Sequence, residues 1–128
     1  MFNTQKKYFK KKIDGVQRML WDLGFKRYKS EEIREEIRQA YNVLKTKLDN
    51  LEEKIKNAKS ENLAGLQDKK IIMERDLKRY EDQMKGIDLD IFGSKPTSEY
   101  PEGIQGIDQQ IDALIELREM IKEYIKIL

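Results

Sequence analysis

The chain of 128 residues contains no cysteine and no histidine. Without cysteine there is no disulfide bond, no thiol nucleophile and no cysteine-ligated zinc. Without histidine the chain lacks the commonest metal ligand and the usual imidazole base. These absences leave a thin catalytic repertoire, so we predict that the protein is not an enzyme and holds neither a cofactor nor a metal.

Turn-forming residues and long apolar runs are scarce as well. The chain has seven Gly and two Pro, and no stretch of eighteen consecutive apolar residues that could span a membrane. The N-terminus also lacks the apolar segment and small-residue cleavage site of a secretory signal. We therefore expect a cytoplasmic protein with few turns.

What is abundant is charge, at 39%, beside 38% apolar residues. This composition is typical of long helices and coiled coils, and 128 residues suit a single domain. The sequence predicts an all-α fold: an elongated helical bundle of about four helices with a long, coiled-coil-like hairpin. Residues 1–29 would form a basic amphipathic helix and a connector, and residues 30–128 the hairpin plus a C-terminal helix that returns along it.

The strongest apolar pattern lies in the last twenty-five residues. Apolar side chains alternate there in steps of three and four, which is typical of one face of a helix, and only Arg118 interrupts them. They are Ile104, Ile107, Ile111, Leu114, Ile121, Ile125 and Leu128. A second set lies beside them and comprises Ala113, Leu117, Met120, Tyr124 and Ile127. Because the combined stripe exceeds the usual width, we expect this helix to lie between neighbours, with Leu117, Met120 and Tyr124 as candidate contacts with a partner helix.

The first apolar stripe predicts a helix over residues 3–23. Its members are Phe9, Ile13, Val16, Leu20 and Leu23. Gly24 would close this helix in the left-handed conformation, with Phe25 folding back onto its end. Ser30 would then cap the next helix. Trp21 and Phe25 are further candidate contacts with a partner helix.

The next apolar stripe runs to residue 58, fades between residues 57 and 70, and then resumes. It comprises Ile33, Ile37, Ala40, Leu44, Leu48, Leu51, Ile55 and Ala58. Either one rod spans residues 31–85, or the chain turns near Ser60 into a hairpin. We favour the hairpin, because Ser60 can cap a new helix and a lone rod would have no partner for its stripe.

Gly86 would end the third helix. Residues 87–91 alternate between apolar side chains and aspartate, which fits an extended connector or a very short strand. Residues 93–101 hold both prolines and predict a loop. Pro101 suits a first helical turn, but the final helix is expected to be firm only from Ile107 onward.

Charge is unevenly distributed. Residues 1–30 carry nine Lys or Arg and two Asp, a net +7, whereas residues 31–128 carry seventeen basic and twenty-two acidic side chains, a net −5. The asymmetry indicates a basic arm that meets an acidic partner, or one that docks on the protein's own acidic body. The candidate contacts with an anionic partner are Lys6, Lys7, Lys10, Lys11, Lys12, Arg18, Lys26 and Arg27.

Three interpretations of this basic arm stay open. It could be a solvated lysine face, a weak and salt-sensitive site for nucleic acid with no base-reading pattern, or a site for an anionic membrane surface. Aromatic side chains also interleave with cations, an arrangement that can stack bases or form a protein-binding hot spot, although a core or capping role explains them too. These residues are Trp21, Phe25, Tyr28, Lys26, Arg27 and Lys29.

Acidic pairs four residues apart, such as Asp108 and Asp112, share a helical face and can in principle bridge a metal. The Glu31–Glu36 cluster, however, is interleaved with Arg34 and Arg38, as in salt-bridged surface helices. We therefore predict no metal site.

The C-terminal part resembles a known family. A spacer rich in Gly, Ser and Pro precedes Ile107-Asp108, Ile111-Asp112, residues 114–118, Ile121 and Ile125. Over residues 40–128 this is similar to the helical part of small phage regulators of the ArpU/RinA type, in which a helix-turn-helix follows. The sequence ends at Leu128, where that module would begin, so the family's DNA binding is carried over to no residue.

The resemblance implies a mobile-element origin and a part in assembly or regulation. Together with the apolar stripes, it leads us to expect a non-catalytic helical module for protein–protein interaction, one that self-associates and could be a phage or mobile-element accessory protein. The alternative is a nucleic-acid-binding protein that uses the basic N-terminal helix, and a membrane-surface role is less favoured.

Overall fold

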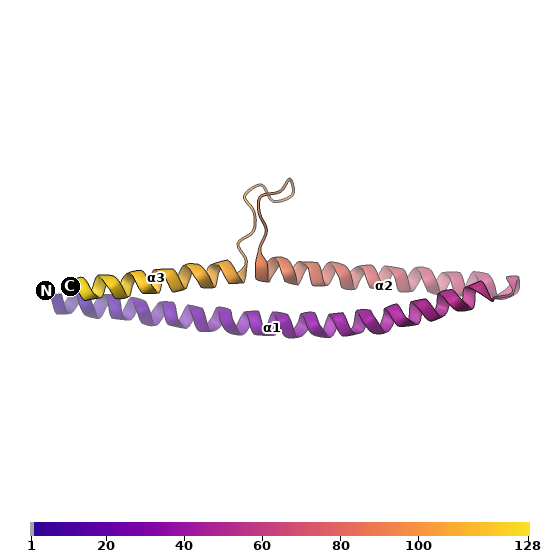
Figure 1. Cartoon of the computed structure of the whole chain (residues 1–128), viewed down its shortest axis with the longest axis horizontal. Coiled ribbons are helices and arrows are strands. Elements are labelled where there is room, and N and C mark those ends of the chain that lie inside the picture. The colour runs from indigo at the N-terminus through magenta and orange to yellow at the C-terminus, as the bar shows by residue number, and fades with distance from the viewer. Residues whose placement is uncertain (1) are drawn as a thin grey trace. The chain divides into compact units, whose positions relative to one another are not determined.

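The computed structural model describes residues 2–128 and contains three helices in that range: α1 (Phe2–Lys56), α2 (Ser60–Phe92) and α3 (Ile107–Ile127) (Figure 1). The all-α prediction is confirmed, but the expected number of about four helices is wrong. The chain forms two compact units. We call residues up to 30 together with residues 88–128 the terminal unit, and residues 31–87 the hairpin unit.

The predicted helix end at Gly24 is wrong. Helix α1 continues through Gly24, through the expected connector at residues 26–29 and through Ser30, which therefore caps no helix. Among the described residues only Gly93 and Gly103 have positive φ, so Gly24 keeps a helical backbone. Phe25 does not fold back as a cap, and 56% of it is exposed. Glycine inside a helix costs about 1 kcal/mol relative to alanine, a small penalty beside the run of backbone hydrogen bonds that an interruption would remove.

The continuity of α1 is visible in its burial pattern. Buried or half-buried side chains recur in unbroken steps of three and four, the heptad pattern of a coiled coil. In the terminal unit they are Lys6, Phe9, Ile13, Val16, Leu20, Leu23, Arg27 and Ser30. In the hairpin unit they are Arg34, Ile37, Tyr41, Leu44, Leu48, Leu51 and Ile55. Ile33, expected in the stripe, is half exposed, and the polar residues Arg27, Ser30 and Arg34 keep the register across the expected break.

The hairpin unit consists of the end of α1 and most of α2 (Figure 1). Helix α1 ends at Lys56 and α2 begins at Ser60, so the predicted turn is confirmed and the alternative of a single rod is wrong. The core of this unit is narrow, since its buried apolar residues are Leu48, Leu51 and Leu77.

Helix α2 does not end at Gly86. It continues to Phe92, so residues 87–91 are neither an extended connector nor a strand. Ile87 and Ile91 are four residues apart and continue the buried face, and Ile91 is only 1% exposed. Gly93 follows the helix directly and has φ of +70°, a backbone conformation that residues other than glycine avoid. A glycine in this conformation commonly ends a helix.

The predicted loop is confirmed over residues 93–101 and extends to residue 106. Ser94 and Ile104 form an isolated antiparallel bridge that closes it. Pro101 lies in a turn of this loop rather than in the first turn of a helix.

A clip of backbone and side-chain contacts joins the end of α2 to the start of α3. Gly106 lies so close to the preceding chain that a Cβ atom there would come within 2.5 Å of the carbonyl oxygen of Ile91. The Gln109 side chain accepts the N–H of Gly106 at 2.7 Å and donates to the carbonyl of Phe92 at 2.5 Å. Ile91 and Ile107, which lie next to the clip in the sequence, are only 1% and 2% exposed.

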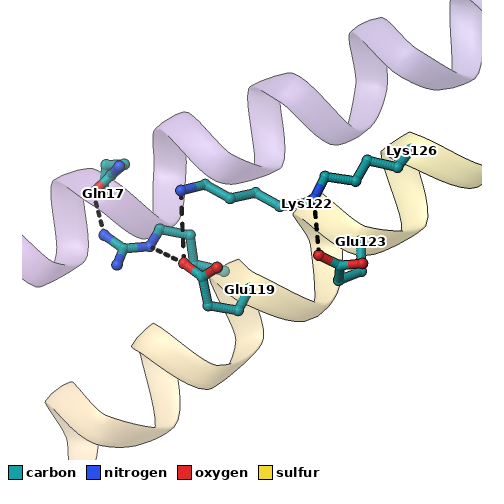
Figure 2. Close-up of polar contacts among 6 residues, drawn as sticks. Gln17, Glu119, Lys122, Glu123 and Lys126 are labelled. Atoms are coloured by element: carbon teal, nitrogen blue, oxygen red, sulfur yellow. Dashed lines mark hydrogen bonds and ion pairs between the residues drawn. The ribbon is translucent and has the colours of Figure 1, made fainter.

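In the terminal unit, α3 runs antiparallel to the N-terminal part of α1 (Figure 1). The rings of Phe9 and Tyr124 meet edge to face at 5.0 Å between centroids. Further along, Arg118 donates to Gln17 at 3.1 Å, and Figure 2 draws this hydrogen bond as a dashed line to the labelled Gln17. We expected α3 to return along the hairpin, but these contacts place it against the basic N-terminal segment.

Candidate functional site

The predicted basic residues all lie on α1 in the terminal unit, but they do not share one environment. Lys6 and Arg27 belong to the line of buried and half-buried side chains along α1, which we call its seam and which faces the rest of the unit. The remaining six are exposed, and they are Lys7, Lys10, Lys11, Lys12, Arg18 and Lys26. The structure therefore divides the candidate set into half-buried residues and residues exposed to solvent.

Arg27 belongs to the first group. Its Nε donates to Oδ1 of Asp108 at 2.5 Å, and Nη2 lies 3.4 Å from Oδ2, so the guanidinium faces the carboxylate as a fork. Both side chains keep about a third of their surface exposed. The ion pair gives Arg27 a partner at its seam position. Asp108 also places a negative charge in the first turn of α3, where the helix dipole favours it.

The basic segment does lie within the same unit as the acidic end of the chain. Residues 88–128 hold nine acidic and four basic side chains, a net −5, against +7 for residues 1–30. Arg118 and Lys122 approach Glu119, and Lys126 approaches Glu123 at 3.1 Å, all within α3 (Figure 2). Glu119 and Glu123 thus form these ion pairs with cations of α3 and not with the exposed lysines of α1.

A broad apolar surface lies on α3 beside its buried seam. The seam keeps the predicted spacing, with Arg118 filling one of its positions. The second predicted stripe is uncovered: Leu117 is 43% exposed, Met120 63%, Tyr124 47% and Ile127 81%. We expected α3 to lie between neighbours, but within the terminal unit only one of its sides is covered.

The same apolar surface continues onto α1. Tyr8 packs edge to face on Phe9, which in turn contacts Tyr124, so Tyr8 extends the exposed stripe across both helices. Met19, 53% exposed, lines a shallow groove of about 470 Å³ together with Ala113 and Leu114 of α3 and other residues. We call this two-helix surface the apolar side of the terminal unit, and define it by Tyr8, Met19, Leu117, Met120, Tyr124 and Ile127.

A second exposed cluster lies on α1 alone. Trp21 is 77% exposed, Phe25 56% and Tyr28 63%, and their spacing of four and three residues places them along one face of the helix. We call these three residues the aromatic stripe. Lys29 lies over the ring of Phe25 at 5.7 Å from its centroid. The sequence named these aromatic residues as candidates, and the structure adds that they share one uncovered face.

Tyr8 and Met19 were not predicted as contacts with a partner helix. Both lie one or two positions from seam residues, and in the sequence each looks like an isolated apolar residue on a charged face. Their place in a common apolar surface is recognisable only from the packing of α3 against α1, which brings Tyr124 close to Phe9 beside Tyr8 and brings Ala113 into the groove with Met19.

The side chains with shifted pKa values lie in the hairpin unit. A side-chain hydrogen bond from Arg38 lowers the pKa of Glu35, and the same contact raises the pKa of Arg38. The hydrogen bond that the Tyr41 hydroxyl donates to Glu81, 3.1 Å long, raises the pKa of Tyr41. All three groups are exposed to solvent or half-buried, and they link neighbouring turns or the two arms of the hairpin rather than converge on a cleft.

No three acidic side chains within residues 2–128 come together in a way that could hold a metal ion. In the same range no helix combines the length and apolar character that a membrane span requires. Comparison of the chain with protein-family models, with curated proteins and with solved structures finds no match.

Proposed function

We propose that this chain is a non-catalytic helical interaction module that associates with a second copy of itself through the apolar side of the terminal unit. The observation that carries the proposal is that this side is uncovered, although it presents large apolar residues from two neighbouring helices. Exposed apolar surface that spans two elements is typical of a protein interaction site.

The pattern on α3 supports a bundle rather than a two-helix coil. A helix in a two-stranded coiled coil needs apolar residues only at the two seam positions of each heptad, whereas a bundle helix adds a third. Helix α3 carries both its seam and the adjacent stripe of Leu117, Met120, Tyr124 and Ile127. Two terminal units packed by these sides would form a four-helix bundle, a common arrangement for paired helical hairpins.

Charge supports a second copy as the partner. The α1 part of the unit is strongly basic and the residues 88–128 part is acidic. In a two-fold arrangement that sets α1 of one copy beside α3 of the other, each helix faces the opposite charge, which favours this pairing over one of like helices.

The setting of a phage or mobile-element accessory protein rests on the family resemblance alone, and it stays a prediction.

Light scattering coupled to size-exclusion chromatography tests the proposal. The chain has a mass of 15.3 kDa, and we expect about twice that value at micromolar concentration. Met120→Glu and Ile127→Glu should return the protein to the monomer, because each places a charge on the apolar side while disturbing little of the monomer fold.

Ile71→Glu is the matched control, since Ile71 is 64% exposed but lies in the hairpin unit. It should leave the mass unchanged. A wild-type protein that stays monomeric at the highest concentration reached, or an Ile71 variant that dissociates as fully as the Met120 variant, would contradict the proposal.

A further inference from the structure

The aromatic stripe has no role in the proposed self-association. Trp21, Phe25 and Tyr28 face away from the seam that contains Leu20 and Leu23. Large aromatic side chains that are more than half exposed are unusual on a helix whose opposite face is already covered, and three in one line form a surface rather than isolated exceptions.

The spacing of the stripe fits unstacked nucleotides. With a rise of about 1.5 Å per residue, the three residues lie about 6 Å and about 4.5 Å apart along the helix axis. The bases of one strand are about 3.4 Å apart when stacked and move further apart as the strand extends. Each ring can therefore meet one base of a partly extended strand, whereas bases inside a duplex present no free face.

The charge along the same line fits a phosphate backbone. Lys7, Lys11 and Arg18 precede the aromatic residues at helical spacing on the same outward face, with Asp14 as the acidic side chain between Lys11 and Arg18. Among the residues that the structure describes, none of these three cations forms an ion pair, and Glu119 and Glu123 of α3 are engaged within their own helix (Figure 2). A cationic track that leads into stacking aromatics is the arrangement that binds single strands without sequence preference.

We propose that this face of α1 binds single-stranded nucleic acid, with Trp21, Phe25 and Tyr28 stacking on bases and Lys7, Lys11 and Arg18 contacting phosphates. A lipid surface fits less well. The apolar part of the stripe is only two turns long, and Arg18 and Asp22 lie beside it, so insertion would bring charges towards the acyl region.

Trp21 is the only tryptophan of the chain, so its fluorescence reports directly on the stripe. We expect a single-stranded thymidine oligonucleotide of about twelve residues to quench this emission in 50 mM salt. If the three cations each meet one phosphate, raising the salt to 200 mM should weaken binding about 18-fold. A duplex of the same length should quench little.

Variants separate stacking from charge. Phe25→Ala and Tyr28→Ala should each weaken binding at least about fivefold, while the salt dependence keeps its slope. Arg18→Ala should instead reduce that slope by about 0.7 on a logarithmic scale. Tyr100→Ala in the loop and Lys54→Ala in the hairpin unit are matched controls, and both should bind as the wild type does.

Several results would overturn the proposal. These are an unchanged emission with the oligonucleotide at 50 mM salt, equal quenching by duplex and single strand, and equal salt-dependent binding of polyglutamate. A blue-shifted, brighter emission with anionic vesicles, together with no response to the oligonucleotide, would assign the stripe to a membrane surface instead. The Met120→Glu variant should bind the oligonucleotide as the wild type does, so the test of nucleic-acid binding does not depend on the test of self-association.

Discussion

Replacing Gly24 by alanine tests the continuity of α1, because two arrangements of the chain predict effects of opposite sign. If the helix ended at Gly24 in the left-handed conformation, alanine would cost about 1–2 kcal/mol. In the structure Gly24 is helical, and an added Cβ atom would meet nothing within 4 Å. Gly24→Ala should therefore raise the free energy of unfolding by about 0.5–1 kcal/mol.

Gly93→Ala gives the contrasting case. Gly93 has φ of +70°, and a Cβ atom there would lie 2.3 Å from the carbonyl oxygen of Ile104. Both the backbone conformation and the clash oppose the substitution, so we expect a loss of about 2 kcal/mol or more. Gly65→Ala calibrates the measurement, because Gly65 lies inside α2 with open space around it and should show a gain like that expected at Gly24.

Chemical and thermal unfolding followed by circular dichroism at 222 nm measures these changes. For a chain of this size a change of 1 kcal/mol moves Tm by about 3–6 °C. Because the chain forms two compact units, we expect two unfolding transitions, of which the one that responds to Gly93→Ala would identify the terminal unit. A loss of stability in that transition for Gly24→Ala, with a gain for Gly65→Ala, would refute a continuous α1.

Leu77→Ala should destabilise the hairpin unit by about 2–5 kcal/mol, because it truncates a side chain that is 6% exposed, whereas Ile71→Ala should change the unfolding free energy by less than about 0.5 kcal/mol. Gln109→Ala should lower the Tm of the terminal unit by removing both side-chain contacts that join α2 to α3, a loss of about 1–3 kcal/mol in thermal unfolding. The pKa of Tyr41 is raised by its hydrogen bond to Glu81, so its contribution to stability is complete below pH 10 and is lost as pH rises through the folded-state pKa. Tyr41→Phe should therefore show a flatter decline of stability above pH 10 in denaturant titrations, and a decline equal to that of the wild type would contradict the assigned hydrogen bond.

Much of this fold could be predicted because its apolar stripes are long and regular. The seam of α3 keeps its register through Arg118, whose aliphatic stem can cover apolar surface while its head contacts Gln17. The turn before Ser60 was predictable as well, because the apolar stripe fades after residue 57 and serine is a residue type that favours the start of a helix.

The break that we predicted in α1 shows where such patterns fail. Three successive seam positions are polar, at Arg27, Ser30 and Arg34, and together with Gly24 they look like the end of one helix and the start of another. What allows Arg27 to occupy a seam position is Asp108, which is eighty-one residues away in sequence. No local pattern contains that pairing, so propensity and periodicity alone place the boundary wrongly.

The candidate site was hard to predict from the sequence for a related reason. Leu20 and Leu23 form part of the buried seam, while Trp21, Phe25 and Tyr28 repeat at the same helical spacing on the outward face. Spacing alone shows that each set shares a face, but not which face meets the rest of the protein, because an inner and an outer stripe have the same period. The structure decides this, because α3 packs against the side of α1 that holds Phe9, and the aromatic stripe stays exposed to solvent. A helix that displays its only tryptophan outward gives up the apolar burial that the same residue would contribute in the core, about 1.5–3 kcal/mol for a large side chain. An external ligand that covers the ring would recover that free energy on binding, and for this reason we assign the aromatic stripe to recognition rather than to folding.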